Sequence, residues 1–223
     1  LTVGDYSALQ QMSTEFPFET RTLIEKVLKI GQITDPDINS KFLKFYQDTT
    51  LQTIISSVQS KYSNINDIQK ELSIAFARLE QQIPNLQIPK VYTQISALDQ
   101  SIVAGDGKIG ISLDKYLGED YPIYNKYYIK QQRKQMTRDN IIPDCLMFYL
   151  MSLYPLRNYD FRPQFERDIH MAKIQWVANK AMSNNYYKGK YVDIVSKFMK
   201  INPNIKFEEL LESTDFSGFA NLN

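Results

Sequence analysis

The chain has 223 residues, of which 43% are hydrophobic and 23% are charged, as is typical of a globular protein with a sizeable core. Its 26 basic and 25 acidic residues leave a net charge of +1, so overall charge gives no reason to expect nucleic acid as a partner. One cysteine excludes an internal disulfide, and one histidine leaves few ligands for a zinc site.

The first part of the chain, residues 1–83, is predicted to be helical. Apolar residues recur at spacings of three and four over 18–30, 37–61 and 66–82. The segment 37–61 is predicted to form one long helix or two joined helices. Gly31 is expected to end the helix that precedes it.

Strand patterns are confined to residues 89–113. Val91, Thr93 and Ile95 alternate with their neighbours, which is the period of a half-buried strand. Two apolar runs then flank the residues Gly105-Asp106-Gly107, which accept positive φ angles and predict a β-hairpin.

The sequence therefore predicts an α+β fold that is predominantly helical, with a small antiparallel β-hairpin sheet in the middle of the chain. It is predicted to be a single domain over residues 1–223, with a second helical part at 114–213. The expected helices of this part cover residues 122–136, 141–154, 163–183, 191–201 and 207–211. Residues 214–223 have little periodicity and are expected to form a loose tail.

The stretch Ile109–Pro122, with the sequence IGISLDKYLGEDYP, changes from strand to helical spacing at Asp114. The preceding glycines and Asp106 resemble part of a calcium or phosphate loop, but the other ligand positions of both motifs hold unsuitable residues. Asp114 is instead predicted to cap the following helix by accepting hydrogen bonds from its free N–H groups.

Two other interpretations of the polar residues remain open. Several acids fall within one short region: Asp114, Glu119, Asp120, Asp139 and Asp144. If at least two of Asp114, Asp120, Asp139 and Asp144 met in a cleft, the protein could be a hydrolase or a degenerate metallopeptidase-like protein, although capping is the favoured account of each acid singly. Cys145 and His170 are interpreted as buried core residues rather than as a catalytic pair.

The second alternative is a polyanion-binding module centred on residues 124–138. This segment contains several tyrosines and no acid, and its cations are Lys126, Lys130, Arg133, Lys134 and Arg138. Aromatic residues among cations can hold a polyanion. The favoured interpretation is a helix whose tyrosines pack inward while its cations face water.

The segments IGISLDKYLGEDYPIY and IIPDCLMFYLM resemble the gliding-motility lipoprotein GldB and its relatives. The matching positions are Ile111, Leu113, Asp114, Tyr116, Leu117, Gly118, Asp120, Tyr121, Ile141, Ile142 and Asp144. A weaker match lies at 169–176, with Lys173 at the position of a family lysine, and PKVYTQIS is similar to the family's first strand. The resemblance covers about residues 89–182 and ends before Ile201, after which the family's C-terminal signals have no counterpart.

The resemblance implies a non-catalytic cell-envelope lipoprotein that faces the periplasm and acts by binding envelope proteins, without a cofactor or metal. Because the chain begins at Leu1 rather than Met, the lipid anchor is expected on a removed N-terminal segment. The family also resembles zinc-peptidase-like folds, but the corresponding helix at 141–151 has no His or Glu, so zinc chemistry is expected to be absent. The family-motif residues are predicted to form a surface site: Asp114, Tyr116, Gly118, Glu119, Asp120, Asp144 and Lys173.

Overall fold

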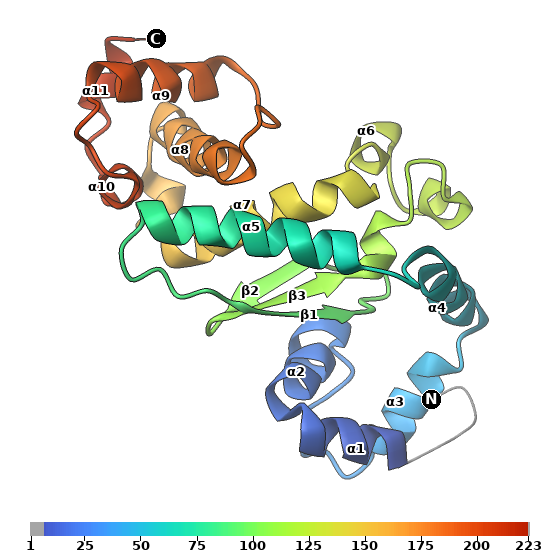
Figure 1. The fold of residues 1–223 in the computed structure, drawn as a ribbon. Coiled ribbons are helices and arrows are strands. Elements are labelled where there is room, and N and C mark those ends of the chain that lie inside the picture. Colours follow the sequence, from blue (N-terminus) through green and yellow to red (C-terminus); the bar gives the residue numbers. More distant parts are fainter. Residues whose placement is uncertain (1–6, 223) are drawn as a thin grey trace. The chain divides into compact units, whose positions relative to one another are not determined.

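A computed structural model of the chain describes residues 7–222 (Figure 1). The chain divides into two compact units, each built from three segments. Unit 1 comprises Leu1–Ile65, Val91–Val103 and Gly110–Asn140, and unit 2 comprises Asn66–Lys90, Ala104–Ile109 and Ile141–Asn223. The single domain predicted from the sequence stays a prediction.

Unit 1 begins with four α-helices and one π-helical segment, which are α1 (Ser7–Glu15), α2 (Pro17–Thr22), η1 (Leu23–Leu28), α3 (Ile38–Tyr46) and α4 (Thr49–Lys61). The predicted segment 37–61 forms two helices because Asp48 caps α4, its carboxylate accepting a hydrogen bond of 2.8 Å from Leu51 N–H. The helical run before α3 ends at Lys29, which adopts a left-handed conformation with φ of 53°. The prediction that Gly31 ends this run is therefore wrong.

These helices pack on a common hydrophobic cluster in unit 1. Its buried members are Leu9, Leu23, Ile24, Val27, Ile38, Phe42, Tyr46 and Leu51. Partly buried residues of later segments, including Ile95, Ala97 and Val103, pack against this cluster. The N-terminal helices thus form a core with the chain around residues 95–103.

The sheet has three strands in the order β1-β3-β2, which are β1 (Lys90–Gln94), β2 (Ile102–Gly105) and β3 (Lys108–Ser112). The predicted hairpin joins β2 to β3 through Asp106 and Gly107, whose φ angles of 48° and 67° are typical of a two-residue type I′ turn. Strand β1 runs parallel to β3, because Lys90 N–H donates to the Gly107 carbonyl at one end and the Gln94 side chain donates to Ser112 Oγ at the other. The sheet is therefore mixed, and the prediction of a purely antiparallel sheet is wrong in this detail.

In β1 the apolar members of the alternating pattern are not the most buried residues. Val91 and Thr93 are exposed, whereas Tyr92 is half-buried and Gln94 is buried. The Tyr92 ring lies over Gly110 in β3, where a Cβ atom would be 2.7 Å from Tyr92 Cζ. The absence of a side chain at Gly110 thus makes room for the aromatic ring.

Replacing Gly110 with Ala is expected to lower the free energy of unfolding by about 1–2 kcal/mol, because the new methyl group would displace the Tyr92 ring. Gly105 in β2 is a matched control, since nothing lies within 4 Å of a Cβ placed there. Urea unfolding followed by circular dichroism would measure both variants. An equal effect of G105A and G110A would contradict the close packing.

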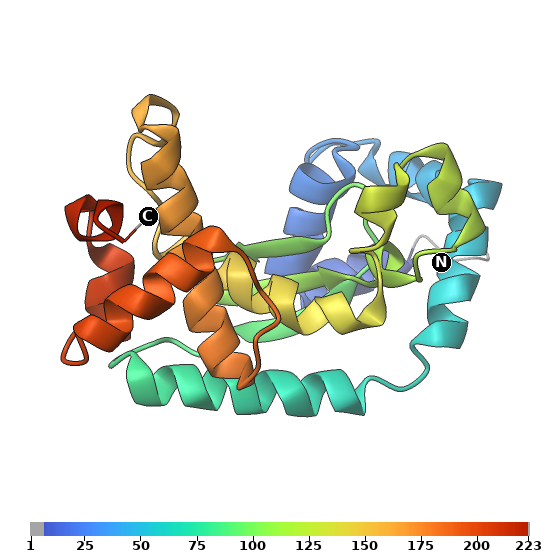
Figure 2. The same ribbon diagram turned by 90° about the horizontal axis from the view of Figure 1, so that it is seen from above.

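Unit 2 contains six α-helices among the described residues, which are α5 (Asn66–Gln82), α7 (Ile141–Leu153), α8 (Gln164–Met182), α9 (Lys190–Ile201), α10 (Phe207–Glu212) and α11 (Ser217–Ala220). The first five confirm the predicted helices to within about two residues. Helices α8 to α11, orange to red, lie together in both views (Figures 1 and 2).

The weak periodicity of 214–223 predicted a loose tail, but the structure forms α11 and buries Phe216 and Phe219.

Short helical turns connect the longer elements. They are η2 (Leu113–Tyr116), η3 (Pro122–Lys126), α6 (Lys130–Arg133) and η4 (Arg138–Asn140) in unit 1, and η5 (Tyr159–Phe161) in unit 2. The single helix predicted over 122–136 is wrong, because Ile129 is extended and separates η3 from α6.

Helices account for 61% of the residues that the structure describes, which confirms the predicted helix-rich α+β class. Among residues 7–222, no helix combines the length and apolarity needed to cross a membrane.

Candidate functional site

Asp114 is fully buried in unit 1 and does not cap its own helical turn. Its Oδ1 accepts a hydrogen bond of 2.9 Å from Ser96 N–H, and its Oδ2 accepts one of 2.7 Å from Leu98 N–H. The Ser96 hydroxyl also lies 3.2 Å from Oδ2. The predicted helix cap is therefore wrong: the carboxylate binds a loop that lies 16 to 18 residues earlier in the chain.

This loop, residues 96–99, has an unusual backbone. Ala97 and Leu98 have φ angles of 52° and 69°, and Asp99 N–H donates to the Ser96 carbonyl. Two positive φ angles in succession are the pattern of a type I′ turn, which glycine, asparagine and aspartate favour and which strains larger residues. The hydrogen bonds to Asp114 hold the loop in this conformation.

The carbonyl of Leu98 is held as well. Lys115 Nζ donates to it at 3.2 Å and to the Tyr128 hydroxyl at 2.8 Å, and that hydroxyl in turn donates to the Leu98 carbonyl. The 96–99 loop is thus fixed through its N–H groups by Asp114 and through a carbonyl by Lys115 and Tyr128.

Burial governs the ionisation of both charged groups. Removal from water raises the pKa of Asp114, although hydrogen bonds from Ser96 and Leu98 oppose the change. Burial lowers the pKa of Lys115, opposed by the charges of Asp114 and Asp99. The charge of Asp114 therefore favours the protonated form of Lys115.

The chain changes direction at residues 114–117 of the family motif, and tyrosine hydroxyls stabilise this corner through hydrogen bonds. The Tyr124 hydroxyl donates to the Asp114 carbonyl at 2.5 Å and accepts from Leu117 N–H at 2.9 Å. The Tyr62 hydroxyl donates to the carbonyl of the buried Tyr116 at 2.6 Å. These bonds fix the change of direction after β3, so Tyr116 stabilises the fold and is not a surface residue.

Glycine and two acids follow this corner. Gly118 has φ of 117°, which disfavours other residues, and its N–H donates to the Met136 carbonyl at 2.9 Å. Glu119 is half-buried and its carbonyl accepts from Arg133, whereas Asp120 is exposed.

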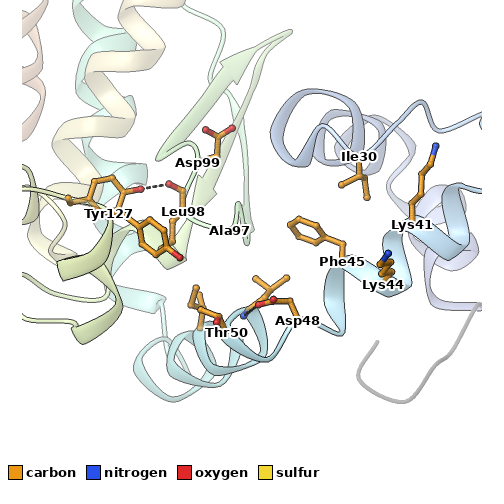
Figure 3. A pocket seen from close by; sticks show the side chains of 13 residues that line it. Ile30, Lys41, Lys44, Phe45, Asp48, Thr50, Ala97, Leu98, Asp99 and Tyr127 are labelled. Carbon is orange, nitrogen blue, oxygen red and sulfur yellow. Dashed lines mark hydrogen bonds between the residues drawn. The ribbon is translucent and has the colours of Figure 1, made fainter.

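The 96–99 loop lines a pocket in unit 1 with a volume of about 890 Å³. The other lining residues are Ile30, Lys41, Lys44, Phe45, Asp48, Thr50, Leu51, Ile54, Tyr127 and Tyr128. Figure 3 shows Phe45 approaching the cavity from one side and Leu98 and Tyr127 from the other. We call this cavity the unit 1 pocket.

The unit 1 pocket combines an apolar interior with a charged rim of both signs. Leu51, Ile54 and Leu98 are buried, whereas Tyr127 is 62% exposed at the edge. Lys41 forms ion pairs with Asp35 and Asp37, at 3.5 and 3.0 Å, which raise the pKa of its ammonium group. Such a lining can hold apolar side chains of a protein segment while the rim contacts its polar groups.

The predicted acids do not line this pocket. Asp114 is buried and hydrogen-bonded to the backbone of the 96–99 loop, and Asp120 and Asp139 are exposed. The described residues also form three smaller pockets, lined by residues from 81–84 and 176–207, from 198–219, and from 53–61 with 117 and 121. None of these four described pockets is lined by any of the five acids, Asp114, Glu119, Asp120, Asp139 and Asp144. Within residues 7–222, no group of three or more His, Cys, Asp or Glu is placed to hold a metal ion. The hydrolase alternative receives no support from this geometry.

Only some residues of the predicted basic patch are exposed and could contact a polyanion. Lys126, Lys130 and Lys134 are exposed. Arg133 is half-buried, and its guanidinium donates to the Asn125 side chain and to the Glu119 carbonyl. The patch lies on two short turns rather than on one helix face, and polyanion binding by it stays a prediction.

Two predicted candidates in unit 2 are core residues. Cys145 is fully buried, and burial together with the charge of the half-buried Asp144 raises the pKa of its thiol. His170 is 7% exposed, and burial followed by the charge of Lys173 lowers the pKa of its imidazole. A high thiol pKa opposes thiolate formation. The interpretation of both residues as core residues is consistent with this burial.

Lys173 in α8 is fully buried and therefore not a surface residue. Its Nζ donates to the Ser213 carbonyl at 2.8 Å and lies 4.5 Å from the Phe216 ring centre and 5.3 Å from that of Phe219. Burial lowers the pKa of this ammonium group to about 8, although Asp215 opposes the change. Lys173 thus connects α8 to the C-terminal segment of unit 2.

The residues that line the unit 1 pocket escaped the sequence analysis. They come from three separate segments, 30–54, 97–99 and 127–128, which no local spacing connects. Asp114 was the one indication in the sequence of such long-range contacts, because a buried acid within an apolar run needs hydrogen-bond donors from elsewhere in the chain.

The comparisons with known proteins identify a family. A family model described as gliding motility protein GldB matches residues 2–191, which extends the resemblance predicted from the sequence in both directions. Curated proteins and solved structures gave no match to the chain. The matched range includes the 96–99 loop, Asp114 and all lining residues of the unit 1 pocket. The chain therefore belongs to the GldB family of gliding-motility lipoproteins.

Proposed function

We propose that this chain is a non-catalytic cell-envelope domain that acts by binding another envelope protein in the unit 1 pocket. The observation that carries the proposal is a cavity of about 890 Å³ whose apolar interior is formed in part by the braced 96–99 loop. Family membership supports a gliding-related lipoprotein of the cell envelope, and the proposal adds a lipid anchor and a position on the periplasmic side.

The pocket favours a partner segment with apolar side chains. Phe45, Leu98 and Tyr127 offer apolar contact from different elements. The rim carries the cation Lys44 and the acids Asp48 and Asp99. It can therefore contact both negatively and positively charged groups of a partner. Burial of an apolar anchor inside a polar rim is the usual arrangement of a protein interface.

Replacing Tyr127 with Ala is expected to weaken partner binding by roughly tenfold, because an exposed tyrosine at a pocket edge typically contributes strongly to an interface. Stability should change little, since the side chain is 62% exposed. A photoreactive amino acid at position 127 should form one specific cross-linked species in envelope extract, and quantitative pull-down with the Y127A variant would measure the loss.

Tyr159 provides the matched control, since it is 49% exposed in unit 2 and lines none of the four described pockets. Cross-linking at position 159 should give no such species, and the Y159A variant should bind normally. Equal cross-linking at both positions, or robust hydrolytic activity without any specific partner, would refute the proposed function.

A further inference from the structure

Unit 2 contains a second cavity, of about 600 Å³, which we call the unit 2 cleft. The end of α5, helices α8 and α9, the loop before α10 and the start of α10 all contribute to its lining. Its central lining residues are Trp176, Lys180, Met199, Lys200, Lys206 and Phe207. None of them lines the unit 1 pocket, and only Trp176 falls within a segment that resembles the family, the weaker match at 169–176.

The charge of the unit 2 cleft is entirely positive. Lys180, Lys200 and Lys206 line it, and no Asp or Glu does. All three lysines are exposed, and within residues 7–222 the structure gives none of them an ion pair. Lys41 in unit 1 differs, since two acids flank it. Three such cations around one concave surface favour an anionic ligand.

The floor of the cleft is apolar. Trp176 and Met199 are 7% and 9% exposed. The ring centres of Phe207 and Trp176 lie 5.2 Å apart in an edge-to-face arrangement. Lys180 Nζ lies 4.9 Å from the centre of the Trp176 ring system. Carboxamide side chains of Gln81, Gln82 and Asn204 complete the wall and can bond a peptide backbone.

These features distinguish between classes of anion. A sugar would need an open aromatic face, but the Phe207 ring and the Lys180 ammonium already pack against the Trp176 ring. Nucleic acid would favour a larger basic surface, whereas the chain has a net charge of +1. A peptide with acidic side chains around an apolar one matches both the lysine rim and the apolar floor.

We propose that the unit 2 cleft binds an acidic segment of a partner protein, with one apolar side chain on the floor beside Trp176 and carboxylates at Lys180, Lys200 and Lys206. This site is additional to the unit 1 pocket and does not depend on binding there. It gives the protein two separate surfaces for protein ligands, one selected by apolar contact and one by negative charge.

The test uses Trp176, which is the only tryptophan of the sequence and therefore reports on the cleft by its fluorescence. The full chain is titrated with a capped peptide of sequence EELEE and with its uncharged counterpart QQLQQ. EELEE should change the Trp176 emission saturably and bind at least about tenfold more tightly than QQLQQ, and its affinity should fall as salt rises from about 0.05 to about 0.5 M.

Lys200→Glu should weaken EELEE binding by about tenfold, because it reverses one charge of the rim. Lys197→Glu is the matched control on the same helix, exposed and outside the cleft, and it should change binding less than about twofold. Thermal unfolding of both variants verifies that they fold. Equal binding of the two peptides, no binding of EELEE, or tighter binding of heparin or an oligonucleotide than of EELEE would overturn the proposal, as would equal effects of both substitutions.

Discussion

Replacing Asp114 with Ala is expected to lower the free energy of unfolding by about 4 kcal/mol. The substitution removes the acceptor of two buried N–H groups, those of Ser96 and Leu98, and each unpaired group costs about 1–3 kcal/mol. It also removes the contacts that hold Ala97 and Leu98 at positive φ, so the 96–99 loop should relax. Urea unfolding followed by circular dichroism measures the loss, and hydrogen exchange at the Ser96 and Leu98 amides locates it.

Two further variants distinguish this role from a general effect of charge. Asp114→Asn keeps one oxygen acceptor but places an NH₂ group against the second amide, so about half of the loss is expected. Asp99→Ala removes an exposed acid of the same loop, whose ion pair with Lys29 at 3.1 Å contributes less than about 1 kcal/mol. A D114A variant that is no less stable than D99A would contradict the bracing role.

The same residue links the family motif to the proposed function. Asp114 does not line the unit 1 pocket, but the loop that it holds contributes Ala97, Leu98 and Asp99 to the lining. Asp114 is therefore a positioning residue: D114A should weaken partner binding as Y127A does, and only D114A should also lower stability. If the proposed function is correct, the motif residue Asp114 acts by fixing the shape of a binding surface.

Local patterns predicted most of the helices and the hairpin correctly. Helix α5 coincides with the predicted segment 66–82, because a long amphipathic repeat is specified by its own residues. The turn at Asp106 and Gly107 was predicted because the required positive φ angles restrict residue choice within two positions. These features depend on interactions between residues close in sequence.

Features that depend on distant residues were predicted poorly. Asp114 has the spacing of a helix cap, but its donors lie in the 96–99 loop, and no local pattern indicates them. The C-terminal tail lacks periodicity, but Phe216 and Phe219 become ordered by packing around Lys173 of α8. A buried charged group needs hydrogen-bond partners from the surrounding chain, and sequence spacing does not show which residues provide them.

Replacing Lys173 with Met is expected to raise the free energy of unfolding by about 2 kcal/mol at pH 7. Met keeps the apolar stem and can contact the Phe216 and Phe219 rings through its sulfur, while it removes a fully buried charge. The loss of the hydrogen bond to the Ser213 carbonyl offsets part of the gain, by about 1 kcal/mol. Denaturant titration of both proteins measures the difference.

The gain should depend on pH in a defined direction. The folded-state pKa of Lys173 is about 8, below its usual value of 10.5, so the unfolded chain holds the proton more tightly between these values. Stability of the original protein should therefore rise with pH from about 8 to about 10.5, whereas this contribution is absent from K173M. The advantage of K173M should disappear or reverse at about pH 10, where neutral Lys173 keeps its bond to Ser213 without the cost of a buried charge.

Lys197→Met is the matched control, because Lys197 is exposed on α9 and its replacement should change stability by less than about 0.5 kcal/mol at either pH. Measuring every variant as a difference from the original protein at the same pH cancels the titration of tyrosines and other lysines. If K173M were less stable than the original protein at pH 7, the aromatic rings and the Ser213 carbonyl would stabilise the ammonium group by more than its burial costs. Lys173 would then be a favourable anchor of the C-terminal segment, rather than a buried charge retained at a cost in stability.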